Sequence, residues 1–186
     1  PKPIKFAVDD AGLMTQATVN MGAPMLDPEQ VPVVAPTNAT TAEGVAYVAD
    51  MPLESPWGTF VFTCGSMGNP HAVCHLGDLD ALQADCFTDP NNRSLETFRI
   101  NEIGAFFESH PAFPEKTNVE FYTAQDSEHL TMRVYERGCG ETMACGTGTC
   151  ATVVAAYLNG VANAEATVQL LGGQLRIGYS PSEVLM

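Results

Sequence analysis

The sequence predicts an α+β fold in which short strands wrap on a few helices. Short β-prone runs separated by turn residues recur along the whole chain. Apolar residues with helical spacing follow one glycine-rich segment near residue 150. With 186 residues and 45% hydrophobic content, the chain is long enough to bury a substantial core. Strands and helices that do not alternate regularly are typical of the α+β class.

The first predicted element is a β-hairpin. Ile4, Phe6 and Val8 alternate with other residues up to the turn sequence at 9–12, and a second extended run continues through Val19. One hairpin alone is only marginally stable in water. We therefore expect this segment to be the edge of a larger unit.

A proline-rich connector follows the hairpin. Prolines at 24, 28, 32 and 36 exclude a helix interior, and the polar run 37–41 ends the segment. These features predict a boundary near residue 36. Residues 1–36 are expected to be the end fragment of an N-terminal domain plus the connector, and residues 37–186 a C-terminal domain.

The middle of the chain predicts three strands and a helix. The strand-like runs are 45–49, 59–64 and 72–76, and the last two are separated by a tight polar loop at 65–71. Residues 85–94 are expected to be a loop, and Ser94 to cap a helix that stops before Pro111. Its shared apolar face would consist of Leu95, Phe98, Ile103, Phe106 and Phe107.

The last third predicts two further hairpins around the clearest helix. The first hairpin pairs 121–123 with 130–135, and the second pairs 167–171 with 174–179 across Gly172-Gly173. Between them, Asn159-Gly160 supplies a left-handed helix stop. The apolar stripe of that helix, which we expect to be buried, is Cys150, Val153, Val154, Tyr157 and Leu158.

Composition excludes several classes of partner. The chain has 22 acidic and 8 basic residues, a net charge of −14, which would repel nucleic acid and anionic membranes. No apolar run approaches the roughly 20 residues of a membrane-spanning helix. Six cysteines without an apolar signal segment are expected to be reduced thiols in the cytoplasm. We expect a small-molecule substrate, no nucleic acid and no membrane.

The segment 136–149 carries the residues best suited to chemistry. Its glycines let a ligand approach the backbone, and the first turn of the following helix leaves N–H groups without internal partners. Such a terminus can hold an anion. Cys145 lies beside it, where the helix dipole is expected to lower the thiol pKa from about 8.5 towards neutrality.

The residues alone leave other interpretations open. Cys145 is equally compatible with a small core residue beside a glycine turn. A metal site at Cys64, His71, Cys74 and His75 is disfavoured because alternating strand residues face opposite ways, so no metal is expected. For Cys139 and Cys150, which lie near Cys145 in sequence, packing or solvent exposure is preferred over a disulfide.

Three segments together closely resemble the diaminopimelate epimerase family: 67–71 (Met-Gly-Asn-Pro-His), 113–118 (Phe-Pro-Glu-Lys-Thr-Asn) and 136–149. The resemblance implies mostly antiparallel strands around a central helix, one of two pseudo-symmetric halves. It also implies an enzyme of lysine biosynthesis that needs no cofactor and no pyridoxal phosphate. Such an enzyme inverts one α-carbon of LL-2,6-diaminopimelate with two cysteines, one removing and one supplying a proton.

The resemblance also assigns roles to residues of this chain. It implies that Cys145 is one catalytic cysteine, that Glu136 lies near a reacting thiol and the substrate amine, and that His71 tunes the pKa of one cysteine. It implies substrate-binding roles for six residues: Asn69, Asn118, Glu136, Arg137, Gly146 and Thr147.

The chain also departs from the family pattern. No segment before Met67 resembles the motif that carries the first cysteine, and a closing strand is expected after Met186. The stretch 85–103 is longer than usual and could change an outer loop or the surface of a possible homodimer. We therefore expect this chain to be inactive alone. Two alternatives stay open: an enzyme of the proline racemase and hydroxyproline epimerase type, and a non-catalytic domain that binds small anions.

Overall fold

One mixed β-sheet organises the chain. The computed structural model describes residues 2–186, and within them one sheet has eleven strands. The strands of this sheet are β1 (Ile4–Val8), β2 (Met14–Gly22), β5 (Met51–Ser55), β6 (Gly58–Ser66), β7 (Pro70–His75), β8 (Asn118–Ala124), β9 (His129–Glu136), β10 (Gly140–Glu141), β11 (Glu165–Leu170), β12 (Gly173–Ser180) and β13 (Glu183–Leu185). Their order is β1-β2-β13-β12-β11-β9-β8-β7-β6-β5, with β10 paired to β9. The α+β prediction is confirmed.

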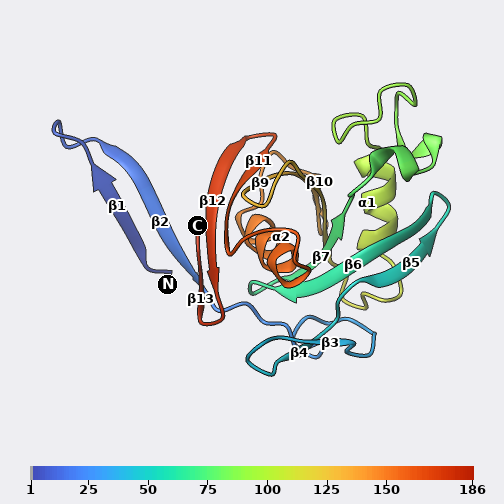
Figure 1. Ribbon diagram of the computed structural model, residues 1–186, viewed down its shortest axis with the longest axis horizontal. Helices are drawn as coiled ribbons and strands as arrows, with labels where there is room; N and C mark the ends of the chain where they lie inside the picture. The colour runs from blue at the N-terminus through green and yellow to red at the C-terminus, as the bar shows by residue number, and fades with distance from the viewer. Residues whose placement is uncertain (1) are drawn as a thin grey trace.

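Most neighbouring strands of this sheet are antiparallel. Two pairs are parallel, β7 with β8 and β9 with β11, and each needs a long connection. The connections contain the two α-helices of the described residues, α1 (Ile100–Glu108) and α2 (Gly146–Leu158). Figure 1 shows α2 lying inside the curve of the sheet and α1 on the opposite side of it.

The two sides of the sheet carry two separate hydrophobic cores. The first core surrounds α2 and includes Val73, Met132 and Val153. The second lies under α1 and contains a group of aromatic rings, in which Phe62 and Phe107 have centroids 4.7 Å apart. Because strand residues alternate between faces, β7 and β8 contribute to both cores.

Helix α2 is buried on nearly every side. Residues 148–156 are all buried, and their small or β-branched side chains let the strands approach closely. Gly160, with φ of 71°, ends the helix as expected. The prediction of a single buried stripe is wrong at Tyr157, which is 44% exposed although its ring lies 5.2 Å from that of Tyr179 on β12.

Helix α1 begins later than the sequence indicated. Its N-cap is Arg99, which makes no side-chain cap, whereas Ser94 instead bonds to Thr97 in a preceding turn. Leu95 and Phe98 are buried, but they reach the core from turns and from a bridge between Phe87 and Phe98. Within the stretch 85–103, residues 86, 87, 95 and 98 are therefore packed into the second core, whereas residues 88–92 are exposed.

Several strand boundaries also differ from the prediction. The run 45–49 supplies only β4 (Ala46–Tyr47), which pairs with β3 (Ala39–Thr40) in a small separate sheet. Strands β5 and β13 were not predicted. The loop at 65–71 is shorter than expected, since β6 and β7 extend into it, and the last hairpin turns at 171–172 instead of 172–173.

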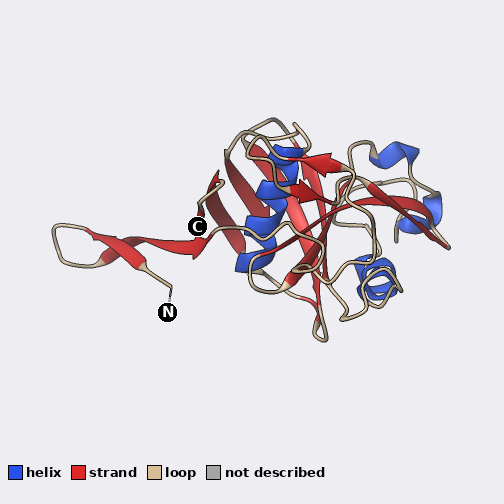
Figure 2. Cartoon of the chain, turned by 90° about the horizontal axis from the view of Figure 1, so that it is seen from below, coloured by secondary structure: helices blue, strands red, loops and turns tan. Residues whose placement is uncertain are grey.

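The predicted N-terminal hairpin is present and projects from the body. Strand β1 pairs with β2, and Figures 1 and 2 show the arm extending away from α2 and the remaining strands. Ile4, Phe6 and Val8 share one face of β1 and are exposed, Phe6 by 68%. The boundary near residue 36 stays a prediction.

The described helices are also short. Within residues 2–186, none is long and apolar enough to cross a membrane.

Candidate functional site

Cys145 lies at the start of the buried helix α2. It is the N-cap residue in an extended conformation, and its side chain is 7% exposed. Its Sγ accepts a hydrogen bond from the Gly148 amide at 3.4 Å and lies 3.4 Å from the Thr147 hydroxyl. The thiol therefore occupies the place that a serine or aspartate side chain takes in an ordinary N-cap.

Two further amides of this helix start remain open. The first helical bond is donated by the Thr149 amide to the Cys145 carbonyl, 2.8 Å away. The preceding amides of Gly146 and Thr147 have no acceptor within residues 2–186, and both residues are partly exposed. Two unpaired N–H groups at the positive end of a helix form a suitable site for a carboxylate.

The pKa of Cys145 differs in direction from the sequence prediction. The pKa of this thiol is raised to about 11, mainly by burial and also by the negative charges of Glu120 and Glu136. The Thr147 hydroxyl and the Gly148 amide lower it, but they do not offset the other effects. The expected pKa near neutrality was wrong, and Cys145 is a protonated thiol at pH 7.

A second buried acid–base group faces the same side of the sheet. His71 on β7 and Glu120 on β8 are both fully buried, and His71 Nδ1 lies 2.7 Å from Glu120 Oε1. The other ring nitrogen, Nε2, lies 3.2 Å from Asn69 Oδ1. Burial raises the pKa of Glu120, whereas the interaction with His71 lowers it.

Glu120 connects this group to the helix start. A Cβ atom built on Gly148 would lie 2.6 Å from Glu120 Oε1 and 3.3 Å from Cys145 Sγ. Only glycine allows the helix to approach the carboxylate so closely. The His71–Glu120 pair and Cys145 thus meet at Gly148.

Sequence reasoning missed Glu120. In the sequence Asn-Val-Glu-Phe-Tyr the glutamate alternates with Val119 and Phe121, as it would on a strand with one solvated face. The available signal was Tyr122, since a large aromatic two positions from a glutamate indicates that both faces of the strand are covered.

Asn118 joins the three sequence motifs. It is 3% exposed, its Nδ2 donates to the Pro70 carbonyl at 2.7 Å, and its Oδ1 accepts from the Arg137 amide at 2.9 Å. The turn that carries Asn69 is thereby tied to the end of β9. The Arg137 guanidinium is exposed and donates to the Glu115 carbonyl at 3.0 Å.

Glu136 lies at the end of β9, on the approach to Cys145. Its Oε1 accepts a hydrogen bond of 2.5 Å from the Thr142 hydroxyl, and the side chain is partly buried. Its negative charge is the smallest of the effects that raise the pKa of Cys145.

Within residues 2–186, none of the other cysteines forms a hydrogen bond with Cys145, His71 or Glu120. All six are free; Cys139 is exposed, and Cys150 is buried inside α2. Cys64 and Cys74 belong to the second core, whereas His71 faces the first, as strand alternation predicted. Across residues 2–186, no three His, Cys, Asp or Glu side chains are placed to hold a metal ion.

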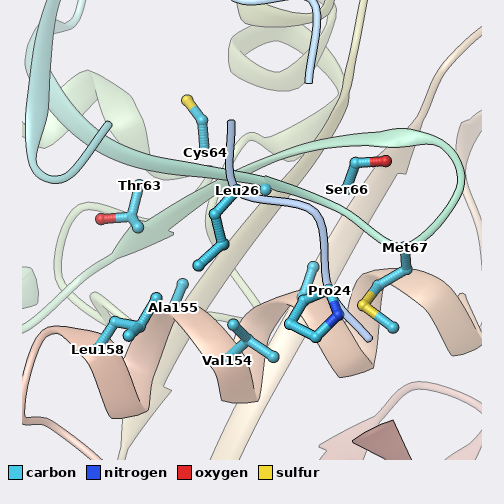
Figure 3. Close-up of a pocket in the computed structure, with 11 residues that line it drawn as sticks. Pro24, Leu26, Thr63, Cys64, Ser66, Met67, Val154, Ala155 and Leu158 are labelled. Carbon is cyan, nitrogen blue, oxygen red and sulfur yellow. The ribbon is translucent and has the colours of Figure 1, made fainter. Parts of the chain in front are cut away.

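A small apolar crevice elsewhere on α2 is not part of the site. It lies between Pro24 and Leu26 of the connector, strand β6 and the later turns of α2 around Val154. Figure 3 shows apolar side chains converging there and Cys64 pointing away from the helix. The crevice lacks charged groups and carries none of the predicted site residues.

Comparison with known proteins places the chain among epimerases. Residues 63–184 match the family model described as diaminopimelate epimerase. Diaminopimelate epimerase from Synechocystis is 42% identical over 168 residues, which are 90% of this chain and 52% of that protein. The enzyme of Acetivibrio thermocellus is 40% identical over 179 residues, covering 96% of this chain and 55% of its own length. The chain therefore spans about half the length of these relatives.

Two solved structures share the fold at low identity. A probable proline racemase from Agrobacterium radiobacter aligns with 98% of this chain and 52% of its own, with a TM-score of 0.57 and 12% identity. A hydroxyproline epimerase from Agrobacterium vitis aligns with 98% of this chain and 51% of its own, with a TM-score of 0.56 and 17% identity.

Proposed function

Since the chain belongs to the diaminopimelate epimerase family, we propose that it supplies one of the two thiols of an amino-acid epimerase. The substrate would be LL-2,6-diaminopimelate, inverted at one α-carbon to the meso isomer without a cofactor. The observation that carries the proposal is the placement of Cys145 beside the open amides of Gly146 and Thr147 at the start of α2.

The proposed reaction moves one proton off the α-carbon and another onto it. A thiolate from the part of the parent protein outside this chain removes the α-proton from one face. Cys145 donates its S–H proton to the opposite face, and the roles exchange in the reverse direction. A pKa of about 11 supports the donor role, because the thiol holds its proton until the carbanion forms.

The open amides would stabilise the developing negative charge. An α-carboxylate held by the Gly146 and Thr147 N–H groups gains charge as the α-proton leaves, and the hydrogen bonds then strengthen. Asn69, Asn118 and Arg137 are the proposed contacts for the distal end of the substrate. In this structure Asn118 is occupied by two backbone groups, so its proposed role includes holding the turn and the strand end together.

Deuterium exchange tests this proposal. The intact parent protein, supplied with LL-diaminopimelate in heavy water, should incorporate deuterium at the α-carbon, whereas the 186-residue chain alone should not. Rapid exchange by this chain alone would contradict the two-half assignment. Exchange of proline, and not diaminopimelate, by the intact protein would favour the proline racemase type. No exchange of either would favour the anion-binding domain.

Two broader properties belong to the same proposal. Free thiols are a condition of this chemistry, so we place the protein in the reducing cytoplasm. A homodimer stays a prediction.

A further inference from the structure

We infer that Glu120 is a positioning residue of the epimerase site: its carboxylate fixes the imidazole of His71 and lies against Gly148, beside the thiol of Cys145. The inference rests on the proposed function for its meaning in the reaction. Its geometry stands on the structure alone.

The complete burial of Glu120 indicates that this residue has a role besides packing in the core. It is fully buried in the centre of β8, between neighbours whose side chains build the apolar cores. A carboxylate in such a place lowers stability unless it is fully paired. A residue selected for packing alone at this position would be apolar.

Only one of its two carboxylate oxygens is paired. Oε1 meets His71 Nδ1 at 2.7 Å, whereas Oε2 has no hydrogen-bond partner within residues 2–186. A half-satisfied buried group is rare in native proteins and is concentrated at functional sites. We therefore infer that the Glu120 carboxylate is present for its charge and for orienting His71, although its unpaired oxygen lowers the stability of the fold.

The contact with His71 determines the orientation of the imidazole. Glu120 contacts Nδ1 and Asn69 contacts Nε2, so the ring is held at both nitrogens. A histidine held at both ring nitrogens has a fixed ring plane. Without Glu120, the ring would keep only the 3.2 Å contact with Asn69.

The contact with Gly148 places the carboxylate at the positive end of α2. A negative charge there is favoured by the helix dipole, and it also lies close to Cys145. The charged and titratable groups that face this point come from three elements: His71 on β7, Glu136 on β9 and Cys145 at the start of α2. Cys64 on β6 lies on the opposite face of the sheet, although the charge of Glu120 contributes to its raised pKa. Glu120 and Glu136 both oppose formation of the Cys145 thiolate, and Glu120 is the stronger of the two.

The test measures the reactivity of Cys145 in this chain and needs no turnover. In a Cys139→Ser background, which removes the exposed thiol, iodoacetamide labelling of Cys145 is followed by mass spectrometry from pH 7 to 10.5. We expect E120Q to label about three- to tenfold faster at pH 8.5. Below the pKa of a thiol, the thiolate fraction rises about tenfold for each unit by which that pKa falls. E108Q is the matched control, because Glu108 is also buried but pairs with Lys116 and the Gly138 amide.

Two outcomes would overturn the inference. One is a folded E120Q chain that labels at the unaltered rate; the other is E108Q having the same effect as E120Q. A second measurement leaves Glu120 unchanged, in case E120Q does not fold. In the Cys139→Ser chain, alkaline titration should shift the His71 imidazole nitrogen resonances as the Cys145 thiolate forms, and Cys145→Ser should abolish that shift. An identical titration in both chains would contradict the coupling. A failure of epimerase activity in the parent protein would leave both readouts unaffected.

Discussion

Replacing Gly148 by alanine tests the close approach of α2 to Glu120. The new Cβ would lie 2.6 Å from Glu120 Oε1, well inside van der Waals contact. The carboxylate cannot simply move away, because the same oxygen is held by buried His71 at 2.7 Å. The helix start must shift or the buried pair must break.

Three contributions set the size of the effect. Alanine in place of a helical glycine stabilises by about 1 kcal/mol. Overpacking costs about 1 to 3 kcal/mol, and weakening a buried charged hydrogen bond costs about 1 to 3 kcal/mol. We expect a net loss of about 2 kcal/mol in the free energy of unfolding. For a domain of this length the loss corresponds to a fall in Tm of about 4 to 8 °C.

Chemical denaturation and thermal unfolding would measure this loss, with Gly146→Ala as the matched control. At Gly146 the added Cβ meets only the flexible end of Met186, at 3.0 Å from Sδ, so the cost should be smaller. In a Glu120→Ala background, Gly148→Ala should become neutral or stabilising. A G148A chain at least as stable as the unaltered one would refute the reasoning.

Three further predictions concern the second hydrophobic core, the contacts of Asn118 and the dependence of stability on pH. Phe107→Ala should reduce the free energy of unfolding by about 3 to 5 kcal/mol in urea titrations, because the ring is fully buried among aromatic neighbours; a loss below about 1 kcal/mol would contradict this packing. Asn118→Ala should cost about 2 kcal/mol, since two buried backbone groups lose their partner, and protection of the Arg137 amide from hydrogen exchange should fall. Unchanged hydrogen exchange of the Arg137 amide would contradict the link that Asn118 makes between the Pro70 carbonyl and the end of β9. Burial is the main cause that raises the pKa of the Cys74 thiol to about 12 and that of the Cys145 thiol to about 11. Between pH 9 and 11 these thiols therefore ionise in the unfolded state before they ionise in the folded state, and Tm should fall as the pH rises. A Tm that stays constant up to pH 11 would contradict the buried state of these thiols.

Elements with strong local signals were predictable from the sequence. The hairpin at β1 and β2 and the stop of α2 at Gly160 follow from side-chain alternation and from glycine's freedom at positive φ. Strand β5 was missed because Pro52 disfavours a strand, yet a proline is tolerated on the edge strand that β5 forms. The start of α1 was misplaced because Phe98 is buried through a turn, which periodicity does not distinguish from a helical face.

The position of Cys145 at a helix start was predictable from the sequence, but the electrostatics around it were not. The helix dipole at Cys145 can be read from the sequence, and it predicts a lowered thiol pKa. Burial and the nearby carboxylates of Glu120 and Glu136 arise only when distant strands meet, and they reverse the direction. The contact between His71 and Glu120 could not be predicted from the sequence, since the two lie 49 positions apart along the chain.

The central claim is that Cys145 exchanges a proton with the substrate, and matched cysteine substitutions test it most directly. In the intact parent protein, α-proton exchange of LL-diaminopimelate in heavy water should fall about 100-fold or more in Cys145→Ser, the scale expected for losing a proton-transfer group. Cys139→Ser, a change at the exposed cysteine six residues earlier, should exchange at the unaltered rate. Full exchange by a correctly folded Cys145→Ser protein would contradict the assignment of Cys145.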